Sequence, residues 1–301
     1  MRFDCFCSFQ IFKTIICKLM KQKCSLLTRS NEKERKKNEK MAQMATLTEK
    51  QANEYLNARP TYPTIWYKVL AGRTSNHKVA WDVGTGNGQA ALGVADYYEK
   101  VVATDINEKQ ISLAKPHPKV TYLHTPASMS DDDLVAKLGG ENSIDLIVAA
   151  QSLHYFDLKR FYAIVRRVLR KEGGIIAVWV YNDLVVTPKV DAIMKRLVDS
   201  TKPYRTPTMN LAFDGYKAIE FPFKNIRLGT QGRPKALEIP HKLSLDGYLG
   251  FFKSWQPLVK AKEQGAELLK PSMINEFKEA WGDQNQVKDV AYRAFMLAGK
   301  L

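Results

Sequence analysis

The stretch that decides the fold is residues 79–88, VAWDVGTGNG, in which a short apolar run containing an acid is followed by three closely spaced glycines. Val79–Val83 predicts a buried strand, and Gln89–Tyr98 predicts the helix that follows the glycines. In a doubly wound sheet this first strand-to-helix turn lies at the carboxyl edge of the strands, where ligands bind. The sequence therefore predicts an α/β fold with a ligand site at this turn.

The same alternation of strand and helix continues through the next hundred residues. Further strands are predicted at Val101–Thr104, Val120–Leu123, Ile144–Ala149 and Ile175–Val180, and further helices at Asn107–Ala114, Asp131–Leu138 and Lys159–Leu169. The strands are continuous apolar runs, which are typical of strands buried on both faces. We therefore expect a doubly wound, mostly parallel sheet between two layers of helices, with its core at residues 77–181.

Beyond residue 182 the pattern becomes mostly helical, and we expect a helical cap and two closing strands in residues 182–301. The predicted helices are Lys189–Ser200, Leu245–Lys253, Ala261–Leu269 and Ser272–Ala280, and the predicted strands are Asn225–Leu228 and Val290–Leu297. Upstream, residues 46–72 are expected to be helical, with interruptions at Pro60 and Pro63. Residues 46–301 are thus predicted to form a single domain.

The first forty residues differ from the rest in composition. They hold eleven basic and four acidic residues, and so carry +7 of the net charge of +15. The polar run 31–40 cannot bury enough apolar surface to order itself. A targeting peptide, a membrane-surface helix and a segment foreign to the natural protein all remain open, and the break in composition before Met41 favours the last. Residues 1–45 are accordingly set aside as a disordered or non-native leader.

Composition also limits the class of protein. The remaining charge of +8 fits an anionic small substrate as well as it fits RNA. No apolar stretch approaches the roughly 20 residues of a membrane-spanning helix. We expect no metal site, because no zinc-ligand spacing is formed by the four cysteines, Cys5, Cys7, Cys17 and Cys24.

The glycine-rich turn has the pattern D-x-G-x-G-x-G, formed by Asp82, Gly84, Gly86 and Gly88. A dinucleotide fingerprint would need its third glycine at the position of Gln89, which disfavours a nicotinamide oxidoreductase. Without a pyrophosphate to hold, the turn suits a nucleoside attached to an amino acid, whose ammonium group can pair with Asp82. A tight turn without a ligand is the alternative.

Two further strand ends carry candidate contacts for a nucleoside. Asp105 ends the second strand and can accept hydrogen bonds from both ribose hydroxyls, or alternatively it caps the next helix. Ile106 would then pack on the base. Ser128, after the third strand, can contact the edge of the base or act as an ordinary helix cap.

The fourth strand is followed by Gln151 and His154, at the edge where the reacting group should lie. Gln151 can hydrogen-bond the ligand. His154 is a candidate catalytic residue that orients the second substrate or acts as a base, and a buried structural histidine is the equal alternative. Trp179, Tyr181 and Trp255 are candidate walls of the second site, although such aromatic side chains more often belong to the core.

The chain resembles the class I methyltransferases, and more narrowly the plant embryo-abundant-protein-like methyltransferases, which are related to trans-aconitate-type methyltransferases. The resemblance covers residues 41–301 and rests on QANEYLNARPTYP, AWDVGTGNGQAALGVADYYEKVVATDINEKQI, AAQSLHYFDLKRFY, VLRKEGGIIAVW and AYRAFMLAGKL. It implies a seven-stranded sheet with an antiparallel last strand. The motif matches also imply that Tyr55 and Arg59 contact the cofactor. Without the resemblance, Arg59 would be interpreted as a solvated surface arginine.

The resemblance implies transfer of a methyl group from S-adenosyl-L-methionine, in the cytoplasm, to a small-molecule acceptor that is a carboxylate, possibly an organic acid, or a hydroxyl. Neither nucleic acid nor membrane is expected as a partner, and the chain is expected to be a monomer or a homodimer. Two alternatives stay open: an RNA or protein methyltransferase, and a cofactor-binding protein without catalysis.

Overall fold

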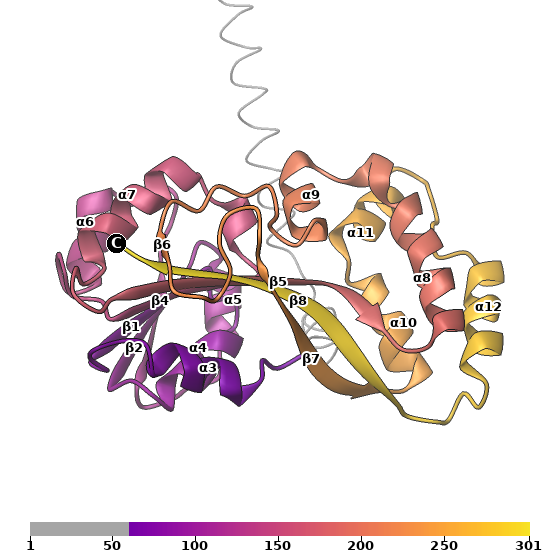
Figure 1. Ribbon diagram of the computed structural model, residues 1–301. Coiled ribbons are helices and arrows are strands. Elements are labelled where there is room, and N and C mark those ends of the chain that lie inside the picture. Colours follow the sequence, from indigo (N-terminus) through magenta and orange to yellow (C-terminus); the bar gives the residue numbers. More distant parts are fainter. Residues whose placement is uncertain (1–59) are drawn as a thin grey trace, which may run out of the picture. The chain divides into compact units, whose positions relative to one another are not determined.

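The computed structural model describes residues 60–301, which lie within one compact unit built on a mixed sheet (Figure 1). The strands are β1 (Val79–Val83), β2 (Lys100–Asp105), β3 (Val120–His124), β4 (Leu146–Ala150), β5 (Ile175–Val185), β6 (Lys224–Asn225), β7 (Lys235–Leu243) and β8 (Lys288–Lys300). Neighbouring strands follow the order β3-β2-β1-β4-β5-β8-β6, and β7 pairs with β8.

The direction of the strands confirms the expected class of sheet. β1 to β5 are parallel to one another, whereas β8 runs antiparallel to β5, β6 and β7. β6 and β7 occupy successive parts of one edge of β8, since Asn225 pairs with Gly299 and Lys235 pairs with Met296. The eight strands therefore fill seven positions across the sheet, and the seventh position is divided into two pieces.

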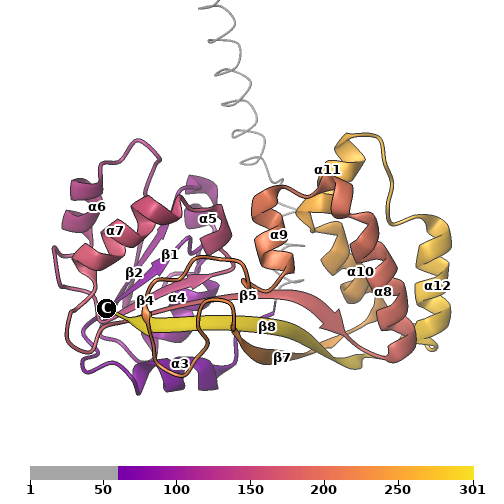
Figure 2. The same cartoon turned by 45° about the horizontal axis from the view of Figure 1, so that its top comes forward.

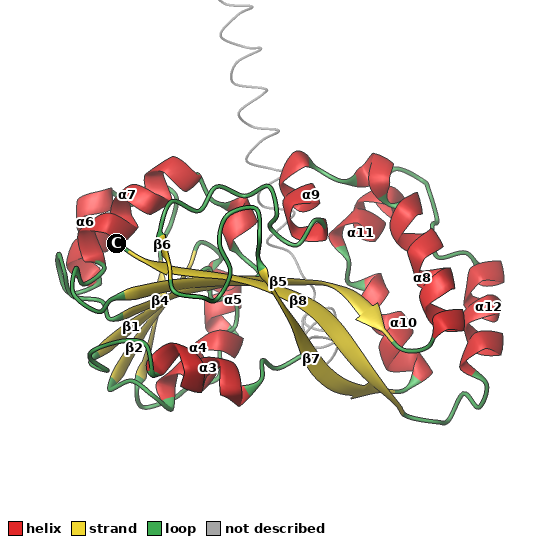
Figure 3. Ribbon diagram, in the orientation of Figure 1, coloured by secondary structure: helices red, strands yellow, loops and turns green. Residues whose placement is uncertain are grey.

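Helices cover both faces of the parallel strands (Figure 3). On one face Leu70 and Val94 pack with Ala80 and Leu146, and on the other face Val165 packs with alternate strand residues. The helices of this part are α3 (Thr64–Ala71), α4 (Gln89–Ala95), α5 (Glu108–Ser112), α6 (Asp131–Lys137) and α7 (Leu158–Val168). Burial of both faces explains why the strands read as unbroken apolar runs.

The cap lies over the C-terminal half of the long strand β5 and the N-terminal half of the long strand β8 (Figure 2). Its helices are α8 (Pro188–Ser200), α9 (Pro207–Phe213), α10 (Leu245–Lys253), α11 (Gln256–Glu263) and α12 (Pro271–Trp281). Aromatic side chains fill its interior, with the ring of Tyr248 5.6 Å from that of Phe277 and 5.4 Å from that of Trp281. This interior is continuous with the core on the α3–α4 face of the sheet.

Two predicted elements differ from the structure, and a strand and a helix were not predicted. The helix predicted at Ala261–Leu269 is wrong, because Pro257 in the first turn starts α11 at Gln256. The strand predicted at Asn225–Leu228 is reduced to β6, while β7 and α9 were not predicted. Of the helical segment predicted over residues 46–72, Thr64–Ala71 is helical and residues 60–63 are the interruption expected at Pro60 and Pro63, whereas the part before residue 60 lies outside the described residues.

Within residues 60–301 no helix is long and apolar enough to cross a lipid bilayer. Over the same residues no group of three or more His, Cys, Asp or Glu side chains is placed to hold a metal ion.

Candidate functional site

The glycine-rich turn connects β1 to α4, as the sequence predicts. Gly84, Gly86 and Gly88 all have positive φ, at 65°, 59° and 90°. A Cβ at Gly88 would lie 2.3 Å from the hydroxyl of Tyr122, and one at Gly84 would lie 2.6 Å from Cβ of Ser152. At Gly86 the nearest atom to such a Cβ is 3.8 Å away. Two of the glycines are thus required by packing within the protein, whereas at Gly86 a Cβ would make only an ordinary contact with the side chain of Gln110.

Asp105 ties this turn to the end of β2. Its Oδ2 accepts a hydrogen bond of 2.7 Å from the amide of Gly86, and its Oδ1 accepts one of 2.8 Å from the amide of Asn107. The helix cap is Asn107, whose side chain accepts from the amides of Lys109 and Gln110. Asp105 is therefore not the side chain that caps α5, and each of its oxygens has further capacity to accept.

Asp82 is fully buried beneath the turn. Its Oδ2 accepts a 2.5 Å hydrogen bond from the hydroxyl of Thr85, whereas Oδ1 has no hydrogen-bond partner. Burial raises the pKa of this carboxyl to about 7, and the nearby charge of Asp105 adds to the rise. A buried carboxylate oxygen without a partner is costly, so this position favours a positively charged or hydrogen-bonding ligand.

Gln151 follows β4 at the same edge of the sheet. Its φ of 57° lies in the left-handed region, which costs a residue with a Cβ about 1–3 kcal/mol and is found most often at functional sites. The amide of Gln151 donates to the carbonyl of Trp179, and its side-chain Nε2 donates to the carbonyl of Tyr181 at 3.0 Å. These bonds fix the side chain between β4 and β5, and they leave Oε1 available.

His154 is buried in the short 3-10 helix Leu153–Tyr155. Its Nδ1 lies 2.9 Å from the hydroxyl of Tyr216, which is fully buried. Burial lowers the pKa of His154 to about 4, so the ring is neutral at pH 7. When the Tyr216 hydroxyl donates to Nδ1, the ring hydrogen of the neutral His154 is on Nε2.

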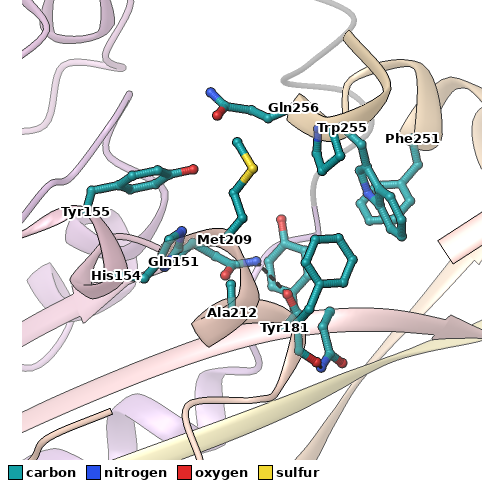
Figure 4. A pocket seen from close by; sticks show the side chains of 12 residues that line it. Gln151, His154, Tyr155, Tyr181, Met209, Ala212, Phe251, Trp255 and Gln256 are labelled. Carbon is teal, nitrogen blue, oxygen red and sulfur yellow. Dashed lines mark hydrogen bonds between the residues drawn. The ribbon is translucent and has the colours of Figure 1, made fainter. Parts of the chain in front are cut away.

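A cavity of about 150 Å³ opens beside Gln151 and His154, between the edge of the sheet and the cap (Figure 4). Of the residues named as candidate walls, Tyr181 and Trp255 line it, whereas Trp179 is buried in the core. The residues within 60–301 that line it are Gln151, His154, Tyr155, Tyr181, Asn182, Met209, Ala212, Phe213, Phe251, Trp255, Gln256 and Pro257. No residue of the glycine-rich turn is among them.

Comparison with known proteins agrees with this arrangement. The family model described as "Methyltransferase domain" matches residues 81–177. A Dictyostelium discoideum protein named as a methyltransferase is 27% identical over 261 residues, which are 83% of this chain and 92% of its own length. A solved structure of a protein described as a type II methyltransferase from Anaeromyxobacter dehalogenans is 32% identical with a TM-score of 0.69, covering 80% of this chain and 97% of its own.

The chain belongs to the class I S-adenosylmethionine-dependent methyltransferases. A Saccharomyces cerevisiae protein that carries the name probable S-adenosylmethionine-dependent methyltransferase CRG1 is also similar, at 27% identity over 135 residues, or 42% of this chain and 44% of its own length. The methyltransferase takes S-adenosyl-L-methionine as its cofactor.

The site of the methyltransferase fits this cofactor on structural grounds. Asp82 supplies a buried carboxylate oxygen without a partner, Gly86 has no close contact at the position of a Cβ, and Ile106 is 59% exposed beside Asp105. An exposed apolar side chain at this edge is suited to the face of an adenine ring. The structure therefore places two acids and an exposed apolar side chain at one edge of the sheet.

The structure does not test three other predicted cofactor contacts. Ser128 is exposed in the loop after β3, and its contact with adenine stays a prediction. Tyr55 and Arg59 lie outside the described residues.

Sequence reasoning did not find Asn182, Met209 and Tyr216. Asn182 could have been found as the first polar residue after the apolar run of β5, by the rule applied to the other strands. Met209 and Tyr216 come from the cap, where no sequence pattern indicates which residues face the cavity.

Proposed function

We propose that this methyltransferase acts on a small-molecule acceptor, a carboxylate or a hydroxyl compound, which binds in the cavity beside Gln151. The observation that supports this most is the position of the cavity, which adjoins the carboxyl ends of β4 and β5 and is lined on its other side by residues of α9 and α11. A cavity of about 150 Å³ has room for a single small molecule.

S-adenosyl-L-methionine supplies a methyl group that is already activated by its positive sulfur. We propose that Asp82, Gly84, Gly86, Gly88, Asp105, Ile106, Ser128 and Gln151 hold it, together with Tyr55 and Arg59. The remaining work of the chain is to align the acceptor and exclude water, and alignment of this kind is worth roughly 7–11 kcal/mol. The sheet and the cap perform it together, with the ring of Tyr181 from β5 and the ring of Trp255 from the start of α11 against the acceptor.

We further propose that His154 orients the acceptor by donating a hydrogen bond from Nε2, since Nδ1 is occupied by Tyr216. A carboxylate acceptor needs no base, because it is ionised at pH 7. The same proposal includes membership of the narrower plant embryo-abundant-protein-like group and a cytoplasmic location. It also includes a monomeric or dimeric state and the absence of nucleic-acid and membrane partners.

The proposal is tested by a labelled-methyl transfer screen against small organic acids, phenols and amines, with total RNA as a control. We expect transfer to at least one small molecule and none to RNA. Transfer to RNA alone would contradict the small-molecule proposal. Tight binding of S-adenosylhomocysteine without transfer to any compound would favour a binding protein without catalysis.

A further inference from the structure

The lining of the cavity is informative about the chemistry of the acceptor. Aromatic and apolar side chains form most of the wall, and its polar groups are the uncharged side chains of Gln151, His154, Asn182 and Gln256, together with tyrosine hydroxyls. None of the described residues that line it is Lys, Arg, Asp or Glu. An ionised group placed in such a cavity loses its hydration without gaining an ionic partner, which is strongly unfavourable.

Arg205 lies next to one wall residue, but its hydrogen bonds are made to residues that do not line the cavity. The guanidinium of Arg205 stacks on the ring of Phe213, with 3.6 Å between its central carbon and the ring centre. Its Nε donates to the hydroxyl of Thr201 at 2.9 Å, and its Nη2 donates to the carbonyl of Val198 at 2.5 Å. Arg205 thus fixes the outer part of the cap and is not among the residues that line the cavity.

The volume of the cavity is sufficient for one aromatic ring. An apolar cavity of about 150 Å³ is large enough to hold a benzene molecule. The rings of Tyr155, Tyr181, Phe251 and Trp255 surround this space in Figure 4. Aromatic walls favour an aromatic guest, because edge-to-face and offset contacts between rings add about 0.5–1.5 kcal/mol beyond burial of area.

We propose that the acceptor is an uncharged compound of one aromatic ring that carries a hydroxyl group, and that this hydroxyl is the methylated group. The inference rests on the proposed function and narrows it from carboxylates and hydroxyls to phenols. Nε2 of His154 donates to the phenolic oxygen as negative charge develops there. In the transfer, this oxygen forms a bond to the methyl carbon as the carbon–sulfur bond breaks, the electron pair of that bond stays on sulfur, and the hydroxyl proton passes to solvent water.

A phenol suits this site better than an aliphatic alcohol for a chemical reason. With Nδ1 accepting from Tyr216, His154 offers a hydrogen-bond donor, and none of the residues within 60–301 that line the cavity is a carboxylate that would act as a base. A phenol ionises near pH 10, as the tyrosine side chain does, whereas an aliphatic hydroxyl is far less acidic. The phenol therefore requires less help to release its proton.

The experiment compares phenol, benzoate and cyclohexanol as acceptors for the full chain, with labelled S-adenosyl-L-methionine as donor. We expect kcat/KM for phenol to exceed that for each of the other two by at least about tenfold, which corresponds to 1.4 kcal/mol. Binding is measured separately by quenching of tryptophan fluorescence in the presence of S-adenosylhomocysteine, since Trp255 lines the cavity. Phenol should quench and benzoate should not.

Two arginine variants on α11 test the reason for this preference. Gln256→Arg places a cation at the cavity wall, whereas Val259→Arg places the same charge on the exposed surface of the helix. We expect Gln256→Arg to raise the ratio of benzoate to phenol transfer about tenfold, as pairing of a buried carboxylate predicts. Val259→Arg should leave the ratio unchanged.

Three results would overturn the inference: equal transfer to benzoate and phenol, equal effects of the two arginine variants, and no transfer to phenol although S-adenosylhomocysteine binds. The first two results would not contradict the proposed transfer of a methyl group to a small molecule. Binding of the cofactor with transfer to RNA alone would reject the proposed function as well, so the two failures can be told apart.

Discussion

Asp105 joins the glycine-rich turn to β2 through its bond to the amide of Gly86. We expect Asp105→Ala to weaken binding of S-adenosylhomocysteine by about 1.5–3 kcal/mol, the range for a hydrogen bond to a charged group. Calorimetric titration measures this loss. Asp96→Ala is the matched control, because Asp96 is an exposed acid at the end of α4. Unchanged affinity in a folded Asp105→Ala variant would reject the placement of the ribose.

Asp82 gives the free protein a dependence on pH that is unusual for an aspartate. Its folded-state pKa of about 7 lies above the ordinary aspartate value of 3.8, so the folded state binds the proton more tightly. The stabilisation from this group is therefore fully present below about pH 3.8 and is lost as pH rises through about 7. The ionised form that appears near pH 7 is the form that pairs with a ligand ammonium group.

The affinity for S-adenosylhomocysteine is accordingly expected to rise with pH up to about 7 and to level off above it. Titrations from acid to alkaline pH measure this change, and the Asp82→Asn variant should show a flatter profile because it has no carboxyl to ionise. If the native protein and the variant have the same profile, Asp82 serves only to hold Thr85 and the turn.

Among the secondary-structure elements, those in the parallel part of the sheet could be predicted from sequence. The starts of β1 to β5 lie within two residues of their predicted positions, because continuous apolar runs have few alternatives in a sheet buried on both faces. β7 was missed because only Ile239 and Leu243 of its nine residues are buried. It carries Pro240, whose missing amide hydrogen is tolerated on an edge strand.

The candidate site was predictable to a similar extent. Asp82, Asp105 and Gln151 lie at the ends of parallel strands, and the topology of such a sheet places these ends at one edge. The cavity wall supplied by α9 could not be predicted, since its position depends on tertiary contacts. One of these is the 2.7 Å bond from Nδ2 of Asn182 to the carbonyl of Phe213.

This bond fixes the end of α9 against β5, at the β-bulge where the register with β8 shifts. We expect Asn182→Ala to raise KM for the acceptor about threefold to tenfold, as loss of one hydrogen bond predicts, and to leave cofactor affinity unchanged. Steady-state kinetics with phenol and calorimetry separate the two effects. Asn210→Ala, at an exposed position on α9, is the control. An equal loss of cofactor affinity would show that Asn182 supports the whole site.

At the scale of the whole molecule, core and cap share their long strands. β5 pairs with β4 over Ile175–Trp179 and continues with β8 as far as Val185, so one strand belongs to both parts. The apolar interior also continues from the α3–α4 face into the cap. The wall of the cavity is thus supported by the same sheet that carries Asp105 and Gln151. This shared support fixes the position of the acceptor relative to the cofactor.

The uneven distribution of charge leads to a prediction for the chain as a whole. Residues 1–40 carry +7 of the net charge of +15, whereas the predicted cofactor contacts all lie beyond Met41. A chain that begins at Met41 should keep the melting temperature and the affinity for S-adenosylhomocysteine of the full chain. Any binding to total RNA by the full chain should weaken with added salt and decrease in the shorter chain, because electrostatic attraction to phosphates follows the number of basic residues. Failure of the shorter chain to fold would instead make residues 1–40 part of the domain.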